Sequence, residues 1–291
     1  MEELILVALA GFLASLVDGA LGMGFGPTSS SILLASGFSP AASAATVNLA
    51  KVATGFSAAL AHWRFRNTDH RLVLKLAIPG ALGAVLGVTI LANVDGDTLK
   101  PVLAVILLLV AVRILLRFSN PLAAPRADSD DPPVFDQKGM ALAAATGGVT
   151  NGLVGAWGPV VTPFLLHRGL PPRYAIGSVN TAEVAVAVVS AGTLLGTIGG
   201  NGVEAATVVA MLIGGVIASP LAAWLIRFLP ARALGVAVGG FLLVTNLRAL
   251  ADWADVGGAR WVGYLVVAVA TTAAALRPRL VQGRQPVLDP A

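Results

Sequence analysis

The sequence predicts an all-α polytopic membrane protein, and three observations support this fold class. The 291 residues are 56% hydrophobic and only 12% charged, about half the charged fraction of an average soluble domain. Nine apolar stretches follow one another along the chain, each close to or above the roughly 20 residues that one bilayer crossing needs. Most charged residues lie between these stretches. So little charge cannot coat a soluble globule of this size, which excludes a soluble enzyme and a nucleic-acid-binding protein.

The apolar stretches are of two kinds. Two of them, at about 30 residues, are too long for one straight helix and too short for two crossings. Each is interrupted by glycine and proline, at residues 22–27 and 155–159, and such a break is tolerated in lipid only where protein or a cavity satisfies the freed backbone groups. We therefore predict an inverted-repeat transporter fold with two re-entrant hairpins, each an arm followed by a half-helix, and about seven further full spans. The nine stretches cover residues 4–36, 40–62, 72–92, 99–117, 139–168, 173–198, 203–227, 231–250 and 258–276.

The distribution of lysine and arginine predicts the orientation in the membrane. Fifteen of the 19 basic residues fall in alternate connecting segments and the C-terminal tail. Three lie in the opposite loops, and the last one, Lys51, lies inside a span. By the positive-inside rule the N-terminus faces outside and the C-terminus faces the cytoplasm. The absence of a basic segment before the first apolar stretch indicates that this stretch is retained.

An internal repeat divides the chain. Shifting the sequence by 132 residues aligns residues 17–53 with 149–185 at thirteen identical positions, including the Gly-Pro pairs 26–27 and 158–159. Between a residue of the first half and its equivalent in the second half, the chain makes three predicted full crossings. Because three is an odd number, the two halves have opposite orientations in the membrane, as is common in secondary transporters. The predicted units are a first repeat (1–118), a cytoplasmic linker rich in Pro, Asp and Ser (119–138), a second, inverted repeat (139–251), an extra transmembrane helix (252–276) and a cytoplasmic tail (277–291).

Three ionisable residues lie deep inside apolar stretches: Asp18, Lys51 and Glu183. Placing one charged side chain at the bilayer centre costs about 2.5–3.5 kcal/mol on insertion scales, so we expect each of the three to have a structural or functional role. Lys51 and Glu183 are equivalent in the repeat, and each follows a matched asparagine by three residues, Asn48 or Asn180. Positions three apart share a helix face. We expect the two charges to meet near a pseudo-two-fold axis, either as a structural ion pair or as an anion-binding lysine with a proton-carrying glutamate. Asp18, one turn before the first break, could pair with Lys51 or be a helix-end carboxylate that faces water.

The half-helices after the breaks supply a second predicted feature. A helix N-terminus presents unpaired N–H groups and about half a positive charge, which suits an anion. The predicted substrate-binding positions at these breaks are Gly24, Gly26, Thr28, Ser29 and Gly158. The hydroxyl groups could instead bond only their own helix backbone.

Two aromatic residues and the absence of several motifs further limit the chemistry that the sequence predicts. Phe25 and Trp157 occupy equivalent places beside the breaks, where they could gate a site or simply pack. With no cysteine, no Walker A loop and no cluster with metal-ligand spacing, we expect no cofactor, no metal and no catalytic residue. The expected partners are a small anion and the lipid bilayer; the sequence leaves open whether the chain forms a homo-oligomer.

The same motifs resemble those of the TauE/SafE sulfite exporter family, in the toluene sulfonate uptake permease superfamily. The resemblance covers nearly the whole chain apart from the linker and tail, although the second break, Gly155-Ala-Trp-Gly158, has fewer glycines than the family usually shows. It implies transport of sulfite, sulfoacetate or a related organosulfonate across a bacterial inner membrane. We expect this transport to be coupled to protons, because Glu183 could carry one. The motifs are the break from Gly22 to Pro27, the Gly37-x-x-Pro40 turn and the helix carrying Asn48, with their recurrence at Gly158-Pro159, Gly169-x-x-Pro172 and Asn180.

Two other functions fit part of the pattern. An uncoupled anion channel needs nearly the same residues as a transporter, and only flux against a gradient separates the two. An intramembrane enzyme acting on a lipid phosphate also can combine inverted repeats with re-entrant helices, but neither hairpin core contains the arginine that such chemistry favours.

Overall fold

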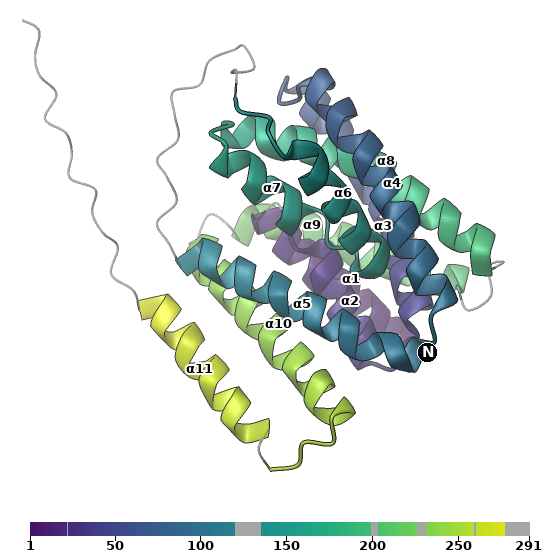
Figure 1. Cartoon of the computed structure of the whole chain (residues 1–291), viewed down its shortest axis with the longest axis vertical. Coiled ribbons are helices and arrows are strands. Elements are labelled where there is room, and N and C mark those ends of the chain that lie inside the picture. Colours follow the sequence, from purple (N-terminus) through teal and green to yellow (C-terminus); the bar gives the residue numbers. More distant parts are fainter. Residues whose placement is uncertain (22, 120–134, 199–202, 226–230, 259, 277–291) are drawn as a thin grey trace, which may run out of the picture.

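A computed structural model describes the chain except for residues 22, 120–134, 199–202, 226–230, 259 and 277–291. The described part is entirely helical and without strands, which confirms the all-α fold class (Figure 1). Most of the predicted linker and the whole predicted tail lie outside the described residues, as does Gly22 of the first break. The helices are α1 (Glu2–Leu21), α2 (Phe25–Ala35), α3 (Pro40–Arg64), α4 (His70–Asn93), α5 (Gly96–Ser119), α6 (Met140–Val154), α7 (Gly158–His167), α8 (Pro172–Ile198), α9 (Ala205–Leu225), α10 (Ala231–Trp253) and α11 (Arg260–Leu276).

The helices have the length and composition of a membrane protein. Four are long and apolar enough to cross a bilayer, and three shorter ones are also apolar. The four cover His70–Asn93, Gly96–Ser119, Pro172–Thr197 and Arg232–Trp253, and the shorter ones Met140–Val154, Ala205–Ala218 and Arg260–Leu276. The chain is therefore a polytopic membrane protein, and the count of seven full spans beside two hairpins stays a prediction.

Both predicted chain breaks are present. The first separates α1 from α2, and the second separates α6 from α7. Gly24 has a φ of 141° and Gly155 a φ of 69°, backbone conformations that glycine adopts without the steric cost of a Cβ. Each break therefore uses glycine where the chain leaves one helix and enters the next.

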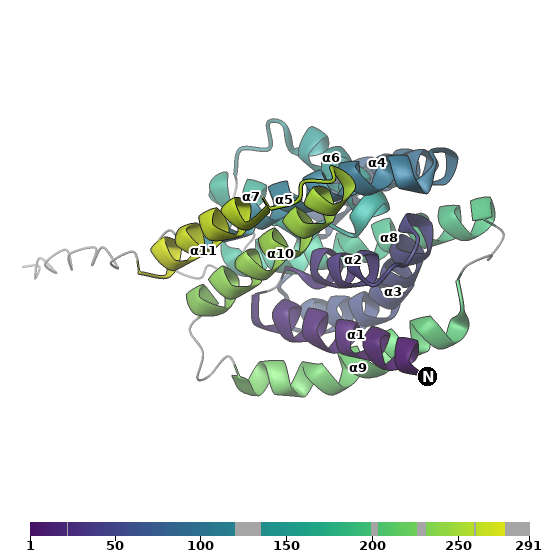
Figure 2. The same cartoon turned by 90° about the horizontal axis from the view of Figure 1, so that it is seen from below.

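The helix order of the first half recurs in the second half. With the shift of 132 residues, α1 to α5 correspond to α6 to α10, and α3 and α8 begin at the matched residues Pro40 and Pro172. The packing follows the same correspondence: α4 packs along α6 as α1 packs along α9, while α3 packs against α8 and α5 against α10. Figure 2 shows the α1–α9 pair and the α4–α6 pair on opposite sides of α3 and α8. The remaining helix, α11, packs on α10 and α5.

The paired helices approach closely at glycines. A Cβ atom at Gly83 of α4 would collide with the backbone carbonyl of Ala145 in α6. In the other pair, a Cβ at Gly214 of α9 would collide with the carbonyl of Ala8 in α1. Small residues at such points let helix backbones touch, which is how helices associate in lipid.

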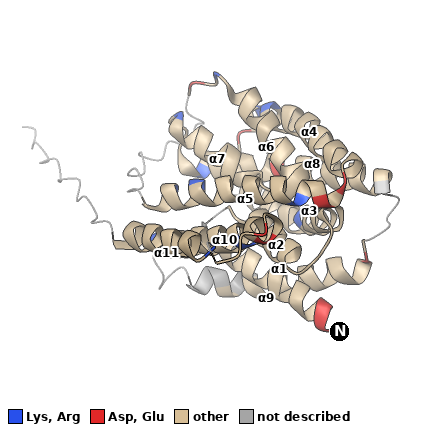
Figure 3. Ribbon diagram, turned by 60° about the horizontal axis from the view of Figure 1, so that its bottom comes forward, with Lys and Arg blue, Asp and Glu red and all other residues tan. Residues whose placement is uncertain are grey.

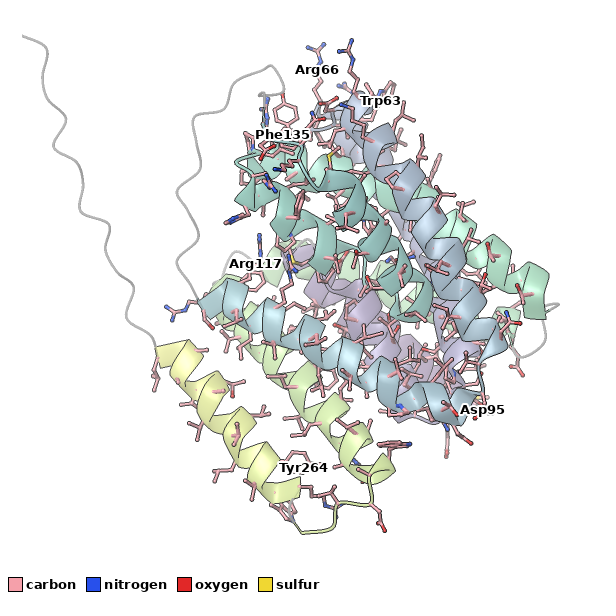
Figure 4. All side chains as sticks on the ribbon, viewed as in Figure 1. Trp63, Arg66, Asp95, Arg117, Phe135 and Tyr264 are labelled. Atoms are coloured by element: carbon pink, nitrogen blue, oxygen red, sulfur yellow. The ribbon has the colours of Figure 1, made fainter. Side chains whose placement is uncertain are left out.

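The outer surface is apolar and the charges gather toward the ends. Large apolar side chains point outward on α4 and α5, for example Leu82 and Leu109, which are 68% and 66% exposed. Most of the ribbon is uncharged (Figure 3). Arg66 and Phe135 lie at one end and Asp95 at the opposite end (Figure 4). These two ends carry the loops that the positive-inside rule assigns to the cytoplasm and to the outside.

Candidate functional site

The two breaks meet around one small cavity. Its volume is about 70 Å³, well above the 10–15 Å³ that a single water molecule needs. The cavity is bordered by α1, by α3 and α8, and by the starts of the half-helices α2 and α7. Its lining consists of Asp18, Met23, Gly24, Phe25, Gly26, Pro27, Lys51, Thr54, Gly55, Ala58, Gly155, Gly158, Pro159, Asn180 and Glu183.

Glycine brings the two broken segments into contact. A Cβ at Gly155 would lie 3.0 Å from the Cα atom of Gly26, and a Cβ at Gly158 would lie 3.3 Å from the Cβ atom of Met23. Both contacts are tighter than most Cβ contacts, so a larger residue at either position would require its neighbour to shift by a few tenths of an ångström. The N-termini of both half-helices therefore face the same cavity.

Lys51 lies at the centre of this arrangement with 5% of its surface exposed. Its ammonium forms an ion pair with Glu183, which confirms the expected meeting of these equivalent positions. It also donates hydrogen bonds of 2.7 Å to Asn151 Oδ1 and 2.8 Å to the carbonyl oxygen of Gly155. Gly155 ends α6, where the helix dipole concentrates negative charge. Three acceptors match the three donors of an ammonium, so the charge is fully partnered.

Asn151 connects the elements around Lys51, and the sequence reasoning missed it. It is fully buried, and its amide group donates 2.8 Å to Asn48 Oδ1 and 3.0 Å to Ser190 Oγ. Asn48 and Lys51 both reach this one residue, as their spacing of three along α3 predicts. A search for buried amides as well as charges would have found Asn151, because it lies inside the apolar stretch 139–168.

Asp18 reaches the cavity from the end of α1. Its Oδ1 accepts a 3.3 Å hydrogen bond from the backbone N–H of Phe25, the first residue of α2. Asp18 thus bonds the first residue of α2 and borders the cavity that contains Lys51.

Asn180 borders the cavity beside Glu183. Its Nδ2 lies 3.3 Å from Nε2 of His62 on α3. The two matched asparagines thus have different surroundings: Asn180 faces the cavity, whereas Asn48 contacts Asn151 behind Lys51.

Some predicted site residues do not reach the cavity. The hydroxyl of Ser29 donates 2.6 Å to the carbonyl of Phe25, one turn back along α2, so it satisfies its own helix backbone. Thr28 is buried, and its hydroxyl has no hydrogen-bond partner within the described structure. Asn48 also lies outside the lining.

The two aromatic residues at the breaks have separate surroundings. Trp157 is fully buried, and its indole N–H donates 3.1 Å to the carbonyl of Val179, so it packs the second half together. Phe25 lines the cavity and keeps the position that a gate would need.

The charged groups of the lining do not form a metal site. Across the described residues, no group of three or more His, Asp or Glu side chains is arranged to hold a metal ion. The cavity instead presents one ammonium, two carboxylates and two helix starts, which is chemistry for a small charged ligand and for protons.

The chain is similar to known membrane proteins. The family model described as "Sulfite exporter TauE/SafE" matches residues 7–249. A curated relative, the "Probable membrane transporter protein YtnM" of Bacillus subtilis (strain 168), is 39% identical over 251 residues, covering 86% of this chain and 83% of the relative. No solved structure matches the chain. The family model covers both halves and both breaks, and the chain therefore belongs to the TauE/SafE sulfite exporter family.

Proposed function

We propose that this protein is a secondary transporter for a small sulfur-containing anion, such as sulfite, sulfoacetate or a related organosulfonate, with its binding site at the cavity between the breaks. Membership of a sulfite exporter family supports the transport of such an anion. The observation that carries the proposal is the convergence of Lys51 with the starts of α2 and α7 on one cavity. Fixed positive charge and helix N-termini are the groups that attract an oxyanion.

Proton coupling follows from the partner of Lys51. In the empty site Glu183 neutralises the ammonium. An incoming anion competes with that carboxylate for Lys51, and a proton on Glu183 removes the competition. Binding of the anion and of a proton therefore favour one another, which is the basis of coupled transport.

Alternating access has a structural basis in the matched halves. The equivalent helices α3 and α8 pack together and carry Lys51 and Glu183, while the other helix pairs follow the same correspondence. Two inverted repeats, 1–118 and 139–251, rocking about a fixed site would expose the cavity to each side in turn. Phe25 would open and close the path beside the first break. In this proposal the protein lies in a bacterial inner membrane with its N-terminus outside.

The test is uptake into liposomes that contain the purified protein. With radiolabelled sulfite outside, we expect saturable uptake that a pH gradient drives above the equilibrium level. Flux that only runs down the anion gradient, whatever the pH gradient, would instead assign an uncoupled channel. Asp97→Asn is a matched control, because it removes an exposed carboxylate of α5 that pairs with Lys100 outside the cavity.

A further inference from the structure

The charges around the cavity limit the valence of the anion that it can hold. The lining contains one ammonium, Lys51, and two carboxylates, Asp18 and Glu183. They come from α3, α1 and α8 in turn. The described lining residues of α2, of α7 and of the second break carry no ionisable group. A further titratable group, His62, contacts Asn180 and does not belong to the lining.

Asp18 makes the two half-helix starts unequal. Its carboxylate accepts the N–H of Phe25 and so holds the place that an anion would take at the start of α2. The equivalent of Asp18 in the second half is Thr150, whose hydroxyl donates 2.7 Å to the carbonyl of Ala156. The start of α7 thus has no carboxylate from its own half. The helix start that remains available to an anion next to Lys51 is therefore the start of α7 at Gly158.

The balance of charge then sets a limit. With all three groups ionised the cavity carries one net negative charge, and with both carboxylates protonated it carries one net positive charge. Even with both carboxylates protonated, the cavity can balance one negative charge on the ligand but not two. An unbalanced charge among mostly buried groups is strongly unfavourable, since much of its solvation is lost and no partner replaces it.

We propose that the cavity binds monovalent oxyanions and discriminates against divalent ones, with Asp18 and Glu183 protonated in the loaded state. This inference rests on the proposed function and narrows it. It selects hydrogensulfite and monosulfonates from the candidate substrates, and it disfavours doubly charged sulfoacetate. It also requires that the apparent affinity for a monovalent anion rises as the pH falls.

Methanesulfonate and sulfate form a matched pair of probes, because they have similar tetrahedral head groups and differ by one charge. We expect the detergent-solubilised wild-type protein to bind methanesulfonate at least ~10-fold more tightly than sulfate in equilibrium titration. Equal affinities, or tighter binding of sulfate, would overturn the valence limit. Binding of neither probe, together with no uptake of sulfite, would overturn the proposed function itself.

The double variant Asp18→Asn/Glu183→Gln fixes the charge of the cavity at one positive charge. We expect it to bind methanesulfonate with an affinity that no longer changes between pH 5 and pH 8, because neither substituted side chain can bind or release a proton. It should keep the preference over sulfate, because Lys51 remains the one cation. A pH dependence as steep as that of the wild type would overturn the role given to the two carboxylates. Asp97→Asn again serves as the control for lost charge outside the cavity.

Discussion

The ammonium of Lys51 lies 2.8 Å from the carbonyl oxygen of Gly155, so a side chain of the first half holds the broken segment of the second half. The same ammonium is paired with Glu183 on α8. A single charged group thus joins the central helix pair, α3 and α8, to the end of α6. In the proposed function, an anion that draws Lys51 away would remove a partner from both the carboxylate and the break, and would so link occupancy of the cavity to the arrangement of the two halves.

Removing the lysine charge alone should destabilise the protein more than removing both charges. Lys51→Met leaves Glu183 in a mostly buried place without its cation, and breaking a buried pair costs about 3–5 kcal/mol. The double variant Lys51→Met/Glu183→Gln should recover most of this loss in thermal unfolding of the detergent-solubilised protein. Sulfite uptake should be absent from both variants. A double variant no more stable than Lys51→Met would show that the ion pair is not the source of the stability.

A methyl group at Gly26 should separate the two breaks. Its Cβ would lie 2.9 Å from the Cα atom of Gly155, with the carbonyl of that residue closer still. Overpacking of this kind costs about 1–3 kcal/mol, and we expect Gly26→Ala to lower both the unfolding temperature and the uptake of sulfite.

The matched control is Gly192→Ala in α8, where an added Cβ meets no atom within 4 Å. That substitution should leave uptake unchanged, because alanine is the better helix former and nothing obstructs it. Comparable losses in the two variants would refute the contact between the breaks.

Asn151 should matter for binding of the anion as well as for stability. Asn151→Ala leaves Lys51, Asn48 and Ser190 each without one hydrogen-bond partner, at a cost of about 1–3 kcal/mol. Because Lys51 then loses its fixed position, we expect a higher KM for sulfite uptake.

Asn246→Ala is the comparison for this effect. Asn246 is also buried, but it donates to Ser31 and borders a different cavity. It should lower stability without changing the KM. An unchanged KM in Asn151→Ala would remove Asn151 from the site.

Sulfite uptake should increase as the pH on the uptake side falls. Protonation of Glu183 frees Lys51 from its partner, so more acid favours the anion. Glu183→Gln removes one titrating carboxylate of the cavity, and Asp18 remains; the pH profile of initial uptake rates should therefore become flatter without becoming level. A profile as steep as that of the wild type would exclude Glu183 as a proton carrier.

The orientation in the membrane can be measured by labelling single introduced cysteines, because the chain contains no cysteine of its own that would react. Phe65→Cys lies in the loop before α4 and Val94→Cys in the loop before α5, with 72% and 39% of the native side chains exposed. In intact cells a membrane-impermeant thiol reagent should label the second position and not the first. Labelling of Phe65→Cys from outside would reverse the predicted topology.

Much of the fold could be predicted because it follows from local rules. The stretch 173–198 became α8 at Pro172–Ile198, and the stretch 40–62 became α3 at Pro40–Arg64, since proline marks the start of each helix and apolar composition marks its length. The ion pair of Lys51 with Glu183 could be predicted from their equivalence in the repeat of 132 residues. An unpaired charge in lipid is costly, so two opposite charges at equivalent positions are expected to pair.

The rest of the site depends on side-chain directions that spacing does not reveal. Asn151 carries no charge and its equivalent is Gly19, so neither a search for charges inside the apolar stretches nor the repeat distinguishes it. Ser29 lies at the start of α2, where it could point to the cavity or along the helix, and its hydroxyl bonds the carbonyl one turn back. A hydroxyl in a helix always has that local option.

Counterflow tests the central claim most directly, because it reports binding and exchange at one site without a driving gradient. Liposomes with the purified protein would be loaded with unlabelled sulfite and diluted into a trace of labelled sulfite. We predict transient accumulation of the label by the wild type and by Asp97→Asn, and none by Lys51→Met. Accumulation by Lys51→Met at the wild-type rate would contradict an anion site built on Lys51 between the two breaks.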